Sequence, residues 1–285
     1  MGVKIPKPGS NGNSDSNNDD VLFGDNNDQG NDPGQGFLHK FPTVLGSLDA
    51  NATDGNGHIL NGSGNPSTNW EIQSNSNFQL GTNIHYRTGD QIMPVANDHG
   101  TLIYDAPAGP QVVDPAHNVS SAAANRGATS FDFSFSTGHG SNPETIQSFL
   151  AHGGQMLVNI DLDPTAGTNF LALHAVYDAT ANPGGSHVVW EDTSGHVVIG
   201  DDAGNQYVTQ NSQNLAFYKS LIDTDPNTPG IQQGGVSPPG QYDLVFEVID
   251  HAGNPSAQGL ASSEDHGNGH IVALQHSQLN LTVPT

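Results

Sequence analysis

The alternation of Phe with polar residues between positions 129 and 136 constrains the fold of this chain more than any other feature. Phe131, Phe133 and Phe135 alternate with Asp and Ser. Successive side chains of a β-strand point to opposite faces, so a period of two places all three rings on one face. The segment is therefore expected to be a strand with one face in a hydrophobic core and the other in water.

Other segments have the same β character. Residues 242–249 alternate large apolar side chains with residues that are themselves partly apolar, which predicts a central strand. Strands are also expected at 156–163 and 279–283. Between residues 187 and 209, turns containing Gly and Asn separate three short runs, which predicts a meander of three strands. These runs are 187–190, 196–199 and 206–209.

Two short segments have helical spacing instead. In the first, Pro143 is the expected first helical residue, with a cap at Ser141 or Asn142 and a stop at Gly153. The second is residues 212–222. Many short strands with two short helices predict an all-β fold, either a β-sandwich or a jelly roll.

The first 36 residues differ from the rest of the chain. Asn, Asp, Gly and Ser dominate them, and their one apolar cluster is Val21–Phe23. Such a composition buries too little surface to offset the entropy of ordering. We therefore expect an acidic tail over residues 1–36 and a single β-sandwich domain over residues 37–285. The Met1–Ser10 segment has no apolar stretch after its lysines, so it does not match a secretory signal peptide.

The charge balance excludes some classes of function. The chain has 6 Lys and Arg against 29 Asp and Glu, a formal net charge of −23. A nucleic-acid binder that contacts phosphates needs the opposite balance. No apolar run approaches the roughly 18 to 20 residues of a membrane span. Self-repulsion at this charge makes bound cations stabilising, and calcium is the expected one outside a cell.

The tail contains the strongest candidate metal ligands. Its Asp20–Asp25 segment, an Asp followed by apolar residues, Gly and Asp, resembles one nonapeptide calcium repeat of bacterial type I secreted (RTX-like) proteins, and residues 25–32 resemble a degraded second one. Calcium takes six to eight oxygen ligands, so carboxylates and amides on such a loop suit it. A solvated acidic linker is the alternative. The candidate ligands are Asp15, Asp19, Asp20, Asp25, Asp28 and Asp32.

Acidic loops elsewhere offer four more candidate calcium ligands. These are Asp54, Asn56, Asp201 and Asp202. They lie in two loops, Asp49–Asn56 and Asp201–Asn205. Neither of these loops has the twelve-residue pattern that ends in a bidentate Glu, so a helix-loop-helix calcium site is excluded. Hairpin turns explain the same Asp and Asn residues equally well.

A second resemblance extends over residues 65–255. The segments that carry it look like a widespread group of uncharacterised bacterial exported or surface proteins. The resemblance implies an extracellular, all-β protein and assigns no catalytic residue. The segments are Asn69–Ile72, Phe78–Gly81, Tyr86–Arg87, Asp161–Phe170 and Tyr242–Asn254.

The sequence offers little for catalysis. It has no Cys, no His-Glu-x-x-His and no Gly-x-Ser-x-Gly. Asp161 and Asp163 would share a strand face, as the carboxylates of a glycosidase do, although a strand end before a Pro turn accounts for them too. His187, Glu191 and His196 could meet across a hairpin, or simply be exposed strand positions.

Three hypotheses follow for function. The first is an extracellular, calcium-stabilised structural or adhesive protein, such as a self-assembling matrix fibre or surface-layer subunit. Its partners would be other copies or cell-surface and matrix components, joined when the tail adds a strand to a neighbour's sheet edge. The second is a carbohydrate- or ligand-binding module that stacks sugars on Trp70 and Trp190, with help from Tyr86 and Tyr104. The third is a secreted metal-dependent hydrolase or lyase.

Overall fold

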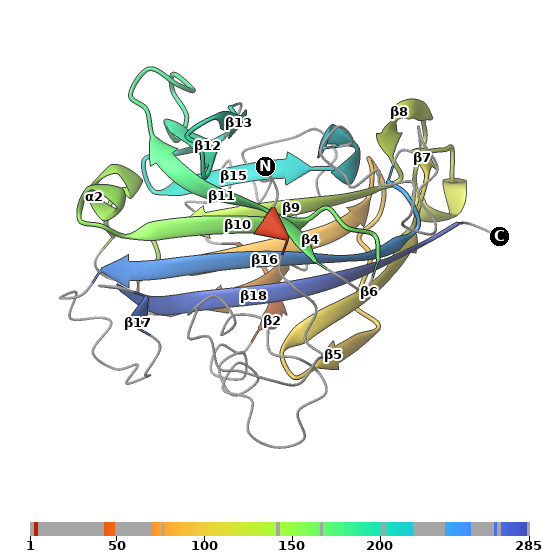
Figure 1. The fold of residues 1–285 in the computed structure, drawn as a ribbon, viewed down its shortest axis with the longest axis horizontal. Coiled ribbons are helices and arrows are strands. Elements are labelled where there is room, and N and C mark those ends of the chain that lie inside the picture. The colour runs from red at the N-terminus through yellow and green to blue at the C-terminus, as the bar shows by residue number, and fades with distance from the viewer. Residues whose placement is uncertain are drawn as a thin grey trace.

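The computed structural model describes ten segments of the chain. They are residues 3–4, 43–48, 70–75, 77–140, 143–165, 168–200, 203–218, 237–251, 265–266 and 269–283. Within them, two stacked β-sheets and a small two-stranded sheet account for nearly all regular structure (Figure 1). The fold is a β-sandwich, as the strand patterns predict.

The first sheet is mixed, because β18 and β6 pair in parallel whereas its other pairs are antiparallel. β1 (Val3–Lys4) adds to β11, and β17 (Asp265–His266) adds to β18. The order across the sheet is β13 (Val197–Ile199), β12 (Val188–Asp192), β11 (Asn169–Tyr177), β10 (Gln155–Asp161), β16 (Gly240–His251), β18 (Gly269–Thr282), β6 (Thr101–Pro107) and β5 (Ala96–Asp98).

The second sheet is antiparallel throughout. Its order is β14 (Ala203–Asn205), β15 (Val208–Gln213), β9 (Thr129–Ser136), β4 (Gln79–Tyr86), β3 (Trp70–Ser74) and β2 (Val44–Gly46). The small sheet pairs β7 (Pro110–Gln111) with β8 (Ala123–Gly127).

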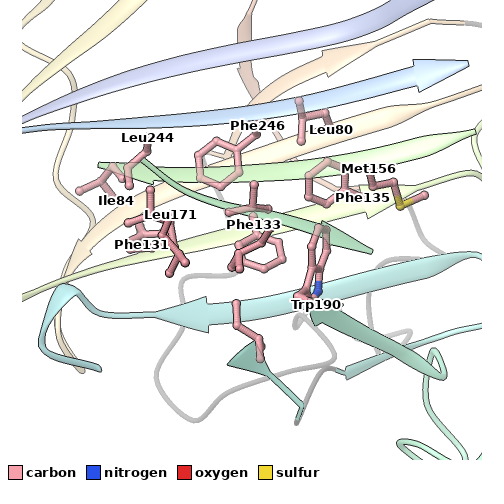
Figure 2. Close-up of a cluster of buried hydrophobic side chains, with 14 of the residues drawn as sticks. Leu80, Ile84, Phe131, Phe133, Phe135, Met156, Leu171, Trp190, Leu244 and Phe246 are labelled. Carbon is pink, nitrogen blue, oxygen red and sulfur yellow. The ribbon is translucent and has the colours of Figure 1, made fainter. Parts of the chain in front are cut away.

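The strands expected from alternation are confirmed. β9 covers the Phe-rich segment, and β16 is an inner strand of the first sheet between β10 and β18. β10 and β18 cover the other two expected strands except at their ends, since β10 stops at Asp161 and β18 at Thr282. The Phe side chains of β9 enter the core between the sheets (Figure 2). Phe133 lies 5.1 Å from Trp190 and 5.9 Å from Phe246, measured between ring centroids, so β9 packs against β12 and β16.

The polar face of β9 is not in water, contrary to the sequence-based expectation. Ser130, Asp132 and Ser134 are all buried. Side chains of neighbouring strands contact two of them: His85 Nε2 lies 3.1 Å from Asp132 Oδ1, and Gln210 Nε2 donates to Ser134 Oγ. Alternation identified the strand but could not show that its outer face is covered.

Both helix predictions need correction. α2 (Ile146–Ala151) begins after Thr145, whose side chain accepts from the Ser148 N–H, because the Glu144 N–H is still bonded to Thr137 in the preceding loop. In the second segment, β15 continues to Gln213 and only a 3-10 turn, η4 (Leu215–Tyr218), follows. Residues 219–222 lie outside the described residues.

The predicted three-stranded meander is also wrong. β12 and β13 form a hairpin in the first sheet, whereas β14 and β15 form a hairpin in the second. The chain therefore passes from one sheet to the other between Ile199 and Ala203. The three runs look alike in sequence because strands of both sheets bury apolar side chains, although Val208 of β15 packs in a smaller cluster with Trp70 and not in the core that contains Trp190 and Ile199.

One buried side chain links the open side of β18 to the second sheet. Gln73 Nε2 donates to Leu274 O at 2.6 Å, and the Leu274 N–H donates to Gln73 Oε1 at 2.9 Å. β6 begins to pair with β18 only at His276, so the Gln73 amide takes the place that a strand would fill beside Leu274. Asn75 repeats the contact with Val272 O.

Replacing Gln73 with Ala should destabilise the fold by about 1–3 kcal/mol, because it leaves the Leu274 N–H and C=O buried without partners. Gln278→Ala is the matched control: this half-buried residue of β18 donates only to Asn280, and its loss should cost less than about 0.5 kcal/mol. Urea unfolding of both variants measures the difference. Equal losses in the two variants would contradict the role assigned to Gln73.

Candidate strand-docking site

The metal ligands expected from the sequence lie outside the described residues. These are Asp15, Asp19, Asp20, Asp25, Asp28, Asp32, Asp54, Asn56, Asp201 and Asp202. Within the part of the chain that the structure describes, no group of three or more His, Asp or Glu residues could hold a metal ion. Calcium binding therefore remains a prediction.

Both tryptophans considered for sugar stacking are buried. Trp190 packs against Phe133 and Phe135 in the core, and Trp70 belongs to a separate cluster with Ile72 and Val208. Neither ring is accessible to solvent. Tyr104 is likewise buried, so these side chains lend no support to the carbohydrate-binding hypothesis.

The histidines proposed as a hairpin cluster serve local contacts. His187 Nδ1 lies 2.7 Å from Ala181 O, and His196 pairs with Asp192 of its own turn. Each of these contacts is within the loop or turn that carries the histidine, and the three residues form no metal site. The exposed-strand alternative is also wrong for the histidines, because each lies one residue before a strand and His187 is half-buried.

Asp161 and Asp163 organise the turn between β10 and β11. Asp161 Oδ1 accepts from the Asp163 N–H at 2.9 Å and from the Asn169 N–H at 2.8 Å. Asp163 Oδ1 accepts from the Thr165 N–H at 2.9 Å. The two carboxylates thus hold the strand end and the Pro164 turn, and they fix the residue at which β11 begins.

The first two residues of β11 have an edge that β12 does not cover. β12 pairs with residues 173–177 of β11, so Asn169 and Phe170 lie beyond its end. The N–H and C=O of Asn169 are directed to the β10 side, where they bond to Asp161 Oδ1 and the Leu162 N–H. Because these groups alternate along a strand, those of Phe170 point the other way, to the edge beyond β12.

β1, at the N-terminus, occupies the edge of β11 that β12 does not cover. β1 pairs antiparallel with β11, with Val3 opposite Phe170 and Lys4 opposite Asn169. Its red arrow lies beside β11 in Figure 1. The strand-docking site is accordingly Asn169–Phe170 with the Asp161 carboxylate behind it. Phe170 and Asp161 are both buried.

Burial gives Asp161 an unusual acidity. Desolvation raises the pKa of this carboxyl to about 7, and the nearby Asp243 and Asp163 carboxylates add to the shift, while the two backbone N–H donors oppose it. Asp161 Oδ2 has no hydrogen-bond partner. The Asp161 carboxyl therefore changes between its protonated and its ionised form near neutral pH.

β1 is a strand that was not expected from the sequence, in which Met1–Ser10 drew attention only as a candidate leader. A signal was present, because Val3 and Ile5 alternate with Lys4 before Pro6. An alternation of three residues is too short to be distinguished from chance without knowledge of a free edge to receive it. The edge itself depends on the length of β12, which the sequence does not reveal.

Comparisons with known proteins add no relative: no family model, no curated protein and no solved structure matches this chain. Across the described segments, none of the helices has the length and apolar character needed to cross a membrane.

Asp161→Asn should change how stability depends on pH. The folded state holds a proton on Asp161 that the unfolded chain releases above its ordinary pKa of 3.8, so the wild type loses stability as the pH rises from there to about 7. The amide of the variant cannot ionise but keeps an oxygen for the two N–H donors. The variant should gain roughly 2–4 kcal/mol relative to the wild type across this range.

Urea unfolding at several pH values measures this effect. Asp98→Asn, on exposed β5, controls for the change in net charge. Parallel stability curves for the wild type and Asp161→Asn would contradict the assigned burial of the carboxyl.

Proposed function

We propose that this chain is an extracellular structural or adhesive protein that assembles when the N-terminal strand of one copy pairs with β11 of another. The observation that supports the proposal is the pairing of Val3–Lys4 with Asn169–Phe170. A strand added to a sheet edge is held by main-chain hydrogen bonds, and these are identical whichever copy supplies the strand.

The chain has the reach for such an exchange. Residues 5–42 connect β1 to Thr43, the residue before β2 of the second sheet. A segment of this length can extend to at most about 135 Å, which exceeds the width of one domain. The same pairing made between neighbours would yield dimers or open fibres, depending on whether the arrangement closes on itself.

Exposed apolar side chains on edge strands support self-association. β2 pairs only with β3 among the described strands, and its Val44 and Leu45 are more than half exposed, at 57% and 53%. Val95, next to the edge strand β5, is 60% exposed. Large apolar residues beside a sheet edge favour contact with another chain.

Calcium is the cation we propose for the assembly. With 29 acidic and 6 basic residues, copies of this chain repel one another in the absence of a counter-ion. Calcium bound by the acidic tail would reduce that repulsion at the segment that also carries β1. Hard oxygen ligands on a loop suit this cation.

Strand exchange predicts concentration-dependent growth in mass that needs Val3. Val3→Pro removes the N–H opposite Phe170 and should leave a monomer, whereas Val3→Thr keeps the backbone donor and should assemble as the wild type does. A chain beginning at residue 37 should also be monomeric. Light scattering on a size-exclusion column measures the masses, and assembly of Val3→Pro at the wild-type concentration would refute strand exchange.

Calcium dependence is tested separately by thermal unfolding and mass measurement with calcium, magnesium or chelator at equal ionic strength. Calcium at about a hundredfold excess over its dissociation constant should stabilise the fold by about 2.7 kcal/mol, and chelator should reverse the gain. Asp20→Asn with Asp25→Asn should weaken the response, while Asp98→Asn with Asp105→Asn, at exposed strand positions, should not. Equal midpoints in calcium and chelator would exclude the calcium part of the proposal and leave strand exchange standing.

A further inference from the structure

Both arginines of the chain contact a single aromatic ring. The guanidinium carbon of Arg126 lies 4.7 Å from the Phe217 ring centroid, and that of Arg87 lies 5.6 Å from it. Arg87 follows β4, Arg126 belongs to β8 and Phe217 to η4, so three separate elements converge here. Phe217 is 38% exposed, which leaves the cluster open to solvent.

A buried asparagine holds together the backbone segments that carry Arg126 and Phe217. Asn214 Nδ2 donates to Gly127 O and Thr129 O, and its Oδ1 accepts from the N–H groups of Gly127 and Ala216. This network joins the end of β8, the start of β9 and the start of η4. The cluster is therefore rigidly supported, as a binding site requires.

The two positive charges are close together, and no described carboxylate forms a salt bridge with either of them. Desolvation lowers the pKa of Arg87, and the charge of Arg126 lowers it further. Arg87 donates weakly to Ser130 Oγ at 3.4 Å, while the nearby Asp132 pairs with His85. In the described part of the chain, no salt bridge joins either guanidinium to an acidic side chain, although acidic residues outnumber basic ones almost fivefold.

We infer that Arg87, Arg126 and Phe217 form a binding site for a doubly charged oxyanion, such as a sulfate or phosphate group. Guanidinium groups bind tetrahedral oxyanions through paired N–H donors, and two of them match a charge of −2. The ring holds both guanidinium planes by cation–π contact, so little side-chain freedom is lost on binding.

The two guanidinium groups set the selectivity. The negative field of the rest of the chain repels every anion, so an ion that reaches only one guanidinium gains little. A dianion that bridges both arginines gains two charge-assisted contacts at once. Sulfate should therefore bind at least about tenfold more tightly than acetate.

Nuclear magnetic resonance tests this inference directly, because a chain with two arginines gives only two Nε–Hε cross-peaks. We expect both cross-peaks to shift together and to saturate as sulfate replaces chloride at constant ionic strength and neutral pH. Inorganic phosphate should act as sulfate does. The rest of the spectrum reports whether each variant is folded.

Variants separate bidentate binding from simple charge. Arg126→Gln should weaken sulfate binding at least about tenfold, and Arg126→Lys, which keeps the charge but loses the paired donors, should not restore it fully. Phe217→Leu should weaken binding through loss of the cation–π contact. His152→Gln, on the exposed side of α2, should bind sulfate as the wild type does.

Two results would overturn the inference. One is a linear shift that does not saturate and is equal for sulfate and acetate. The other is saturable binding that persists unchanged in Arg126→Gln. Assembly and calcium response play no part in this test, so its outcome is independent of the proposed function.

Discussion

The contact of Phe133 with Trp190 and Phe246 is the interaction on which the rest of the structure depends. These rings join β9 of the second sheet to β12 and β16 of the first (Figure 2). Trp190 lies opposite Ala175, so its burial also fixes the register of β12 on β11. That register ends the β12 pairing at Leu173 and leaves the start of β11 to β1. The strand-docking site is thus a consequence of how the core is packed.

Buried carboxyls make the stability of this fold depend on pH. Burial raises the pKa of Glu71 to about 8 and that of Glu247 to about 7, in addition to Asp161. Each raised value means that the group favours folding while it is protonated and that this contribution is lost as the pH rises toward the folded pKa. Protonation of these buried carboxyls and binding of cations by exposed ones would therefore both reduce the excess negative charge of the chain.

The sequence predicts the sandwich because its main signals are local. The Phe alternation of β9 and the double-sided apolar pattern of β16 each depend on side-chain period alone. Features that the sequence did not reveal depend on partners outside the segment itself: Thr145 caps α2 because Glu144 is held by Thr137, and Gln73 binds Leu274 of the other sheet. β1 and the arginine cluster likewise combine segments that are far apart in the chain. The side-chain period of a segment does not show which distant loop, strand edge or aromatic ring that segment will contact.

Disulfide trapping between copies tests strand exchange most directly, since the natural chain has no Cys. Lys4→Cys and Asn169→Cys place thiols at residues that are opposite each other in the β1–β11 pair, at a separation typical of antiparallel neighbours. When the two single variants are mixed in calcium and mildly oxidised, the account predicts a mixed dimer that joins residue 4 of one copy to residue 169 of the other. A yield no higher than that of Lys4→Cys mixed with Thr180→Cys, at an exposed turn, would contradict it.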